Sequence, residues 1–461
     1  MALFHPFSGL VFVLFPVFFF SYVAVLGQEP VLDSVEKESV YRVLESINSE
    51  VPWRSLFPDD LCSSAPHGVV CEYFSDSSDG SSPETVHITE LNFGYVSDFT
   101  PNPPCFPNST INPILFTSFK FLRKLFFYKC FNNSHVSVPD VLPSFVSTLE
   151  ELVFVDNPSL VGPMSGILRN FTNLRRVVLT GNGVYGKIPD VVGDLTNLEE
   201  LTLSRNRLSG EIPSSLSMLK KLKILDLSHN FFDGSPTSIG KGLSELLKLD
   251  LSSNRFFGQI PECFKAMKKL EFLDLSFNHF GNFGVPLFLS EMPRLREVDM
   301  SGNQLGGQIP EIWENLGGVL RLGFSDMGLV GKIPASMGVH LKSLCYLGLD
   351  NNKLEGSVPE EFSLLEFIGE INLENNSLSG KISVSKMFST RIGQKMKLEG
   401  NPELCVDDSL SSAKNSSRLG RLKVCKKPAM PNPVPLIGSS PAKIVPSMFI
   451  SMGLLFLFLF A

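Results

Sequence analysis

Histidine, cysteine and carboxylate side chains are the groups in this 461-residue chain that could hold a metal ion or carry out acid–base catalysis. His229 and His279 lie beside recurring asparagines, but no third metal ligand stands at a suitable spacing from them. The carboxylates recur with the same period instead of forming an isolated pair, and the chain has no GxSxG, HExxH, P-loop or kinase signature. The sequence therefore predicts a protein that is not an enzyme and that has no metal ion or cofactor.

Binding is the other chemistry to consider, and it would rest on side chains that interrupt a regular pattern. Aspartate recurs at positions 226, 250, 274 and 299, and serine follows two residues after each of them. Aromatic residues and arginine are enriched in protein interfaces, so the residues that break this pattern are the predicted contacts for a peptide or protein ligand. The alternative is that they are ordinary surface residues and that the aspartates and serines are structural filler. The five candidates are Phe272, Phe277, Glu297, Arg321 and Tyr346.

The elements that must position these side chains come from an internal repeat with the template LxxLxLxxNxLxGxIP. Residues 198–213 read LEELTLSRNRLSGEIP, and residues 246–261 read LLKLDLSSNRFFGQIP. Cys130 and Met327 take the place of the asparagine in two further units, which gives about eleven units, and a partial strand near Ile88 precedes them. The asparagine recurs in steps of 24 or 25 residues, at Asn157, Asn182, Asn206, Asn230, Asn254, Asn278, Asn303, Asn352 and Asn376.

The spacing within the repeat predicts the fold. Side chains alternate along a strand, so the LxL pair places two apolar side chains on one face of a short strand. No unit can bury that face alone, so neighbouring units must stack around one continuous core. The asparagine turns inward and satisfies backbone groups where the chain leaves the strand. We therefore expect an α/β solenoid, a right-handed superhelix of horseshoe shape with a parallel β ladder on its concave side.

The LxGxIP half of the repeat resembles that of plant extracellular leucine-rich-repeat proteins, and the resemblance covers residues 50–405. WRSLFPDDLCSSAPHGVVCE (53–72) is similar to their N-terminal cap, and GNPELC (400–405) to their closing cap. HITELNFGYVSDFTPNPPC (87–105) and FKFLRKLFFYKCF (119–131) are similar to the Piriformospora indica-insensitive protein branch of the plant receptor-like proteins. That resemblance implies a plasma-membrane protein without a kinase domain, connected with root responses to a beneficial fungus.

Six of the eight cysteines flank the repeats, as expected for disulfides that staple the two caps of an exported solenoid. The expected pairs are Cys62–Cys71, Cys105–Cys130 and Cys405–Cys425, although the sequence alone leaves other pairings open. Cys263 and Cys345 lie inside repeats, and we expect them to be buried free thiols. Five sequons predict glycosylation in the secretory pathway, at Asn108, Asn132, Asn170, Asn375 and Asn415.

Both ends of the chain are apolar. Residues 1–27 read as a signal peptide, with an N-terminal membrane anchor as the alternative. Residues 444–461 form an apolar tail with no basic residue after it, which predicts a glycosylphosphatidylinositol (GPI) signal, with a transmembrane span as the alternative. Gly438, Ser439 and Ser440 are the candidate attachment residues. The predicted layout between the ends is an N-terminal cap at 28–121, repeats at 122–392, a C-terminal cap at 393–427 and a stalk at 428–443.

These features predict a receptor-like protein on the extracellular face of the plasma membrane, attached through its C-terminus. It would bind a peptide or protein ligand and act with a receptor kinase, because nothing in the sequence could signal inside the cell. A formal net charge of -7 gives no reason to expect a nucleic-acid partner. The alternative function is that of a secreted or wall-associated inhibitor of a microbial hydrolase.

Overall fold

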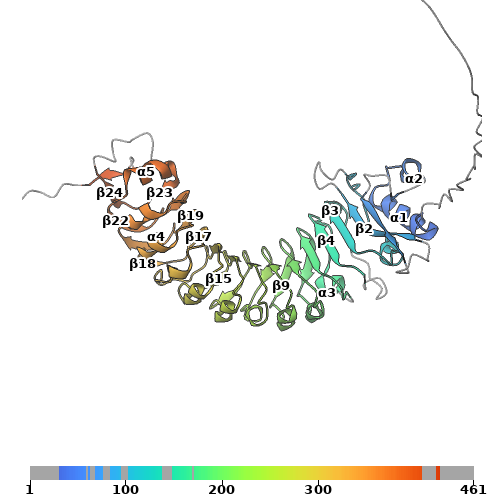
Figure 1. The fold of residues 1–461 in the computed structure, drawn as a ribbon, viewed down its shortest axis with the longest axis horizontal. Coiled ribbons are helices and arrows are strands. Elements are labelled where there is room, and N and C mark those ends of the chain that lie inside the picture. Colours follow the sequence, from blue (N-terminus) through green and yellow to red (C-terminus); the bar gives the residue numbers. More distant parts are fainter. Residues whose placement is uncertain are drawn as a thin grey trace, which may run out of the picture.

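The computed structural model describes residues 31–58, 61–62, 68–75, 84–94, 102–137, 148–168, 171–407 and 422–425. Within these ranges the chain forms a curved solenoid with its strands along the inner side (Figure 1). The predicted signal peptide, stalk and apolar tail lie outside the described residues, as do Gly438, Ser439, Ser440, Asn170 and Asn415. None of the helices in the described ranges has the length and apolar character to cross a bilayer.

The inner side of the solenoid is one sheet of fourteen strands in the described part of the chain. Strand β1 pairs antiparallel with β2, and every later neighbour pair is parallel, so the predicted fold class is confirmed. The strands are β1 (Val69–Phe74), β2 (Thr85–Phe93), β3 (Lys124–Tyr128), β4 (Glu151–Val155), β6 (Arg176–Thr180), β8 (Glu200–Thr202), β10 (Ile224–Asp226), β12 (Lys248–Asp250), β14 (Phe272–Asp274), β16 (Glu297–Asp299), β17 (Arg321–Gly323), β19 (Tyr346–Gly348), β21 (Glu370–Asn372) and β23 (Met396–Lys397).

A second row of short parallel strands lies beside the inner sheet and forms three separate sheets in the described residues. After its asparagine a repeat unit runs extended for a few residues, and within each of these sheets it pairs with the next unit. These strands are β5 (Val161–Pro163), β7 (Gly183–Gly186), β9 (Arg207–Gly210), β11 (Phe231–Phe232), β13 (Phe257–Gly258), β15 (His279–Phe280), β18 (Val330–Lys332), β20 (Lys353–Gly356), β22 (Ser377–Lys381), β24 (Glu403–Val406) and β25 (Lys423–Val424).

Helical turns occupy the convex side, because the residues after each proline close into a single short helix before the next strand. They are mostly 3-10 turns, which suit such short segments. The α-helices are α1 (Ser34–Ile47), α2 (Trp53–Leu56), α3 (Met164–Ile167), α4 (Ser336–His340) and α5 (Lys386–Ile392). The 3-10 turns are η1 (Pro113–Phe116), η2 (Asp190–Asp194), η3 (Ser214–Met218), η4 (Ile239–Lys241), η5 (Glu262–Ala266), η6 (Leu287–Glu291), η7 (Trp313–Asn315), η8 (Glu360–Leu364) and η9 (Gly393–Lys395).

The recurring asparagines tie each unit to the one before it, as predicted. The Nδ2 atom of Asn254 donates to the carbonyl oxygens of Leu227 at 2.9 Å and Leu251 at 3.2 Å. Its Oδ1 atom accepts from the backbone N–H of Phe232 at 3.0 Å. The same pattern recurs at Asn401, which the sequence did not single out, so the ladder continues into the segment assigned to the C-terminal cap.

One backbone feature of the repeat was missed from sequence. The residue before each recurring asparagine adopts a left-handed backbone, whatever its type. Phe277 has φ of 53° there, although such a conformation is unfavourable for a bulky side chain. The inward asparagine fixes the turn that follows the strand, and this turn aims the preceding side chain away from the core.

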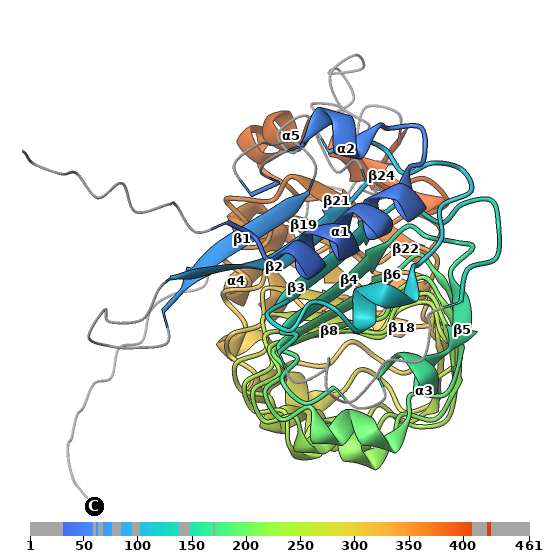
Figure 2. The ribbon, with the colours of Figure 1, turned by 90° about the vertical axis from the view of Figure 1, so that its right-hand side faces the viewer.

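The N-terminal end of the core is covered by α1, which lies across the end of the strand ladder (Figure 2). The Asp33 carboxylate caps this helix by accepting from the N–H groups of Val35 at 2.9 Å and Glu36 at 3.2 Å. Glu36 is itself buried, and its carboxylate accepts from the N–H of Ile88 and lies 3.0 Å from the His87 ring. These bonds join the cap to the first parallel strand.

The three expected disulfides are formed, at Cys62–Cys71, Cys105–Cys130 and Cys405–Cys425. Cys263 and Cys345 are free, as predicted, but the prediction that both are buried was wrong. Cys263 is half-buried. Cys345 is exposed because it lies between the two inward-facing leucines Leu344 and Leu347, where the chain points side chains outward.

Candidate functional site

The concave face presents parallel columns of outward side chains, because each strand is in register with the next. One column starts each strand and contains four of the five predicted contacts, Phe272, Glu297, Arg321 and Tyr346. They lie on the consecutive strands β14, β16, β17 and β19, so the structure brings them together. Phe277 lies beyond the other end of β14 and is not part of this group.

The N-terminal half of this column is a row of alternating charges. Lys124 lies 3.6 Å from Glu90 and 3.8 Å from Glu151, and Arg176 lies 3.4 Å from Glu151 and 2.8 Å from Glu200. Each charge therefore has a partner on a neighbouring strand, so this row presents no free charge to a ligand.

The next column in the N-terminal half is apolar. Phe126, Val153 and Val178 occupy the middle of β3, β4 and β6 and form a cluster of their own, separate from the main core. All three are buried, and Tyr128 and Val155 pack against them. This part of the concave face is therefore closed by its own side chains.

In the C-terminal half the same middle column carries the four aspartates. Each accepts a backbone N–H two residues further on, as Asp250 does from Ser252 at 3.2 Å and Asp274 from Ser276 at 2.9 Å. The aspartates thus shape the strand ends, which supports the structural interpretation of the pattern. Lys248 is the cation that pairs with them in the described residues, at 3.0 Å from Asp226 and 3.6 Å from Asp250.

Electrostatics in this column favour the neutral form of its central carboxyl. Burial raises the pKa of Asp274 to about 6, and the neighbouring carboxylates of Asp250 and Asp299 add to the rise. Burial also raises the pKa of Asp250. The C-terminal half of the concave face therefore differs from the N-terminal half, where each charge in the outer column has an opposite partner.

Aromatic rings and cations are stacked at both ends of the candidate group. The Lys248 ammonium lies 5.1 Å from the centre of the Phe272 ring, and the Arg321 guanidinium lies 4.1 Å from the centre of the Tyr346 ring. Phe272, Glu297 and Tyr346 are partly buried and Arg321 is exposed. We call the column Phe272, Glu297, Arg321 and Tyr346 the inner-face group.

Two glycines beside the inner-face group were missed from sequence. Gly323 and Gly348 take the positions on β17 and β19 that aspartate holds on the preceding strands. A Cβ atom on Gly323 would lie 2.5 Å from the Asp299 carboxylate, and one on Gly348 would lie 3.0 Å from the Tyr346 hydroxyl. The missing side chains let Asp299 and Tyr346 lie flat across the sheet. The only signal in the sequence is LGF (322–324) and LGL (347–349) in place of the LDL of earlier units.

Phe277 occupies the opposite rim of the concave face. Its side chain is 63% exposed, and its ring covers Gly302 in the next unit, where a Cβ atom would lie 2.7 Å from the ring.

Among the predicted sequons, Asn108, Asn132 and Asn375 are exposed. No three histidine, cysteine, aspartate or glutamate side chains in the described ranges are grouped so that they could hold a metal ion.

The register of the strands and the asparagine row define the fold of this protein as a leucine-rich-repeat solenoid. Family models described as leucine rich repeat match residues 172–232, 220–280, 294–316 and 343–365. The resemblance to plant leucine-rich-repeat receptor-like proteins that the sequence predicted is confirmed by two relatives from Arabidopsis thaliana.

The first relative is Protein TOO MANY MOUTHS, 32% identical over 140 residues, which are 30% of this chain and 26% of that protein. The second is Piriformospora indica-insensitive protein 2, 33% identical over 160 residues, which are 34% of this chain and 35% of that protein. The chain therefore matches only about a quarter to a third of the length of these relatives.

Solved plant ectodomains share the fold. The Arabidopsis receptor kinase HAESA, in complex with the peptide hormone IDA and the co-receptor SERK1, is 28% identical with a TM-score of 0.51, over 65% of this chain and 56% of that chain. The ectodomain of the Arabidopsis receptor kinase GASSHO1/SCHENGEN3, in complex with CASPARIAN STRIP INTEGRITY FACTOR 2, is 24% identical with a TM-score of 0.61, over 80% of this chain and 47% of that chain. At that identity the second likeness concerns the fold alone.

Proposed function

We propose that this chain is a non-catalytic receptor-like protein of the plant cell surface that binds a peptide or protein ligand on the C-terminal half of its concave face. The observation that carries the proposal is the inner-face group, which places two aromatic rings, a glutamate and a stacked arginine on four consecutive strands. Aromatic side chains and arginine supply much of the binding energy in protein interfaces. The HAESA complex, which contains a peptide hormone, is a precedent from a related solenoid.

The remaining parts of the proposal concern partners and location. The protein has no kinase domain in the proposed scheme, so it transmits the binding event through a kinase-bearing partner. It reaches the plasma membrane through the secretory pathway, carries glycans and a GPI anchor, and acts on the extracellular face. The likeness to Piriformospora indica-insensitive protein 2 supports a role in the root response to a symbiotic fungus.

Affinity purification of the tagged protein from intact root membranes tests this function. The parent should recover a kinase-bearing membrane protein, and recovery should increase when the ligand source, a fungal or root secretion, is added. The variant with Phe272→Ala, Arg321→Ala and Tyr346→Ala should lose that increase while its thermal unfolding stays close to that of the parent.

A matched control comes from the same face. Thr180→Ala with Thr202→Ala changes outward side chains on β6 and β8, in the N-terminal half of the concave face. This control should behave as the parent does. Recovery of a secreted hydrolase in place of a kinase would favour the inhibitor function. Equal recovery by the parent and the triple variant would show that the inner-face group does not bind the ligand. Release of the parent from membranes by phospholipase tests the anchor separately.

A further inference from the structure

Three hollows follow one edge of the solenoid: the first and third lie where the chain enters the strands, and the second lies beside the convex turns η4 and η5. The first, of about 340 Å³, precedes β4 to β10 and has Arg175 and Lys221 in its wall. The second, of about 540 Å³, has Lys220 and Lys265. The third, of about 310 Å³, has Arg294 and Arg296. A pair of cations thus recurs in successive hollows along the edge, and adjacent residues, Lys220 and Lys221, link the first hollow to the second.

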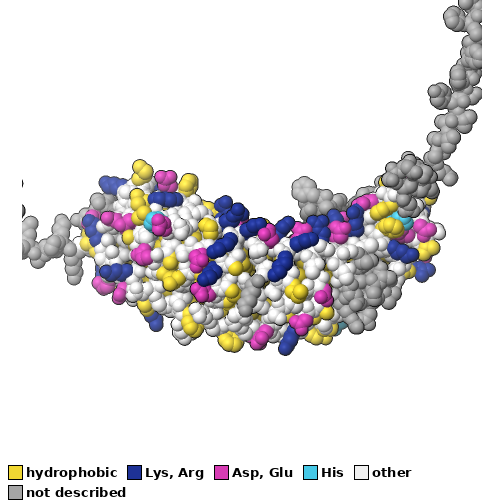
Figure 3. All heavy atoms as spheres, turned by 60° about the horizontal axis from the view of Figure 1, so that its bottom comes forward, with side chains coloured by type: hydrophobic (Ala, Val, Ile, Leu, Met, Phe, Trp, Pro, Cys, Tyr) yellow, Lys and Arg dark blue, Asp and Glu magenta, His cyan; other side chains and the backbone are white. Residues whose placement is uncertain are grey.

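Several of these cations are not neutralised within the described ranges. Lys221 Nζ donates to the Asn197 side chain and Lys220 Nζ to the Ser217 carbonyl, both at 2.8 Å, so both have neutral partners. Arg294 makes no ion pair with a described residue. Lysine and arginine side chains gather in the middle of the face shown in Figure 3, with aspartate and glutamate side chains among them. A protein with a net charge of -7 therefore presents a local concentration of positive charge here.

Carboxylates also line the edge, but most of them are engaged. Glu199 lies 2.7 Å from Lys223 and 2.6 Å from Arg175, and these two contacts lower the pKa of Glu199 to about 2. Glu271 lies 3.9 Å from Arg296. Glu150 lines the first hollow as well. An anionic ligand would therefore bind in competition with these glutamates, so its binding must weaken as salt is added.

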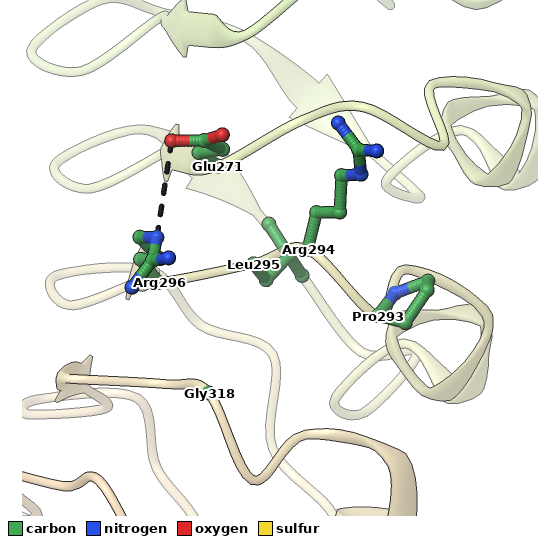
Figure 4. A pocket seen from close by; sticks show the side chains of 6 residues that line it. All are labelled: Glu271, Pro293, Arg294, Leu295, Arg296 and Gly318. Carbon is green, nitrogen blue, oxygen red and sulfur yellow. Dashed lines mark ion pairs between the residues drawn. The ribbon is translucent and has the colours of Figure 1, made fainter.

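The composition of the walls separates two kinds of anionic partner. Figure 4 shows the third hollow, where Arg294 and Arg296 extend on either side of Leu295 with Glu271 and Gly318 across from them. None of the described residues that line the three hollows is aromatic, whereas protein interfaces depend on aromatic anchors. The walls instead offer an amide group at Asn197 and a hydroxyl group at Ser244 that can bond to sugar hydroxyls.

We propose that this edge is a second binding surface, which takes a linear polysaccharide that carries carboxylate groups. The saccharide lies along the edge from β4 to β17, a distance of roughly 35 Å at the usual strand spacing. Its carboxylates contact the recurring pairs of cations, and its hydroxyls bond to the amide and hydroxyl side chains between them. This surface is distinct from the inner-face group, so the protein can hold an acidic matrix and a peptide or protein ligand at once.

Binding of polygalacturonic acid to the whole purified protein at low ionic strength tests the inference. The edge variant carries Lys220→Ala, Lys221→Ala and Arg294→Ala, and we expect it to bind about tenfold more weakly than the parent. The control variant carries Lys187→Ala, Arg207→Ala and Lys353→Ala. These exposed cations lie outside the edge, and their removal changes the net charge equally. The control should bind as the parent does, and thermal unfolding should show that both variants are folded.

Three further measurements decide the outcome. Neutral dextran should not bind, and the triple variant of the inner-face group should bind polygalacturonic acid as the parent does, which separates this inference from the proposed function. If poly-L-glutamate bound as tightly as the polysaccharide, the ligand of this edge would be an acidic peptide and not a saccharide. That result would overturn the assignment. Equal losses in the edge and control variants, or a parent that binds nothing at low salt, would overturn it too.

Discussion

The two halves of the concave face are built from the same repeat but differ in how their charged side chains are paired. In the N-terminal half, a row of alternating charges lies beside a buried apolar column, and its members neutralise one another: Glu90, Lys124, Glu151, Arg176 and Glu200. In the C-terminal half the column holds aspartates, and aromatic rings with stacked cations stand beside it. A solenoid can therefore reserve one stretch of a uniform surface for packing and leave the next stretch open for binding. The predictions below test this division.

The largest effect is expected from a charge placed in the apolar column. Val153 is 1% exposed, so Val153→Asp would bury a carboxylate without a partner and should lower the free energy of unfolding by about 3–5 kcal/mol. Val153→Ala is the matched control, and it should lose less because it leaves only a small cavity. Denaturant unfolding of both variants measures the difference. Similar losses in the two variants would show that this column is open to water.

The aspartate column should make the free energy of unfolding depend on pH. The pKa of Asp274 is raised to about 6 in the folded protein, so its contribution to stability is present at low pH and is lost as the pH rises through 6. Asp274→Asn keeps the acceptor for Ser276 but removes the charge. It should therefore unfold at pH 7 with a free energy about 2–3 kcal/mol higher than the parent, and the gap should close near pH 4. A constant gap between pH 4 and 7 would contradict the raised pKa.

The asparagine row is common to both halves, so its removal should cost the same in each. Asn254→Ala leaves the Leu227 carbonyl and the Phe232 N–H unpaired, and should lower the free energy of unfolding by about 1–3 kcal/mol. Asn157→Ala in the N-terminal half should lose a similar amount, because it bonds in the same way to Phe127 and Phe131. Chemical denaturation checks both variants. An unchanged denaturation midpoint in either variant would show that the asparagine of that unit does not contribute to stability as proposed.

The smallest effect should come from the row of ion pairs. The Arg176 side chain is 40% exposed and touches Glu151 and Glu200, and exposed pairs contribute little. Arg176→Ala should lower stability by less than about 1 kcal/mol. The loss should shrink further in high salt, which screens such pairs. A loss that is large and independent of salt would show that this row is buried in the folded protein.

The sequence predicted the features that the period of the repeat controls. It missed the features that depend on contacts between neighbouring units. The strand ladder, the inward asparagines and the three disulfides follow from spacing within one unit and from the clustering of cysteines. The second row of strands could not be predicted in the same way, because it arises when extended segments of two units meet. Asn401 was left in the cap because GNPELC (400–405) resembles a closing cap, although Met396 and Leu398 before it hold the two apolar positions of a strand.

The arrangement of the candidate site was predicted only in part. The register placed Phe272, Glu297, Arg321 and Tyr346 in one column because they occupy one position of the repeat. It could not show that Arg321 stacks on Tyr346, or that Gly323 and Gly348 let neighbouring side chains lie flat. Phe277 also points outward and is exposed, but it follows the strand and lies on the opposite rim, apart from the other four. Contacts between side chains of adjacent units depend on rotamers, and no single unit specifies these.

The asparagine bonds run in one direction along the chain, and this gives the molecule a polarity. Each asparagine reaches back to satisfy groups of the unit before it, as Asn376 does for the carbonyl of Leu349 and the N–H of Leu354. Either cut would bare backbone groups of the strand ladder, but trimming from the C-terminal end would also bare the carbonyl and N–H groups that the removed asparagine had satisfied. The Cys405–Cys425 link stands at the vulnerable end. A protease that frays this protein should advance more readily from that end.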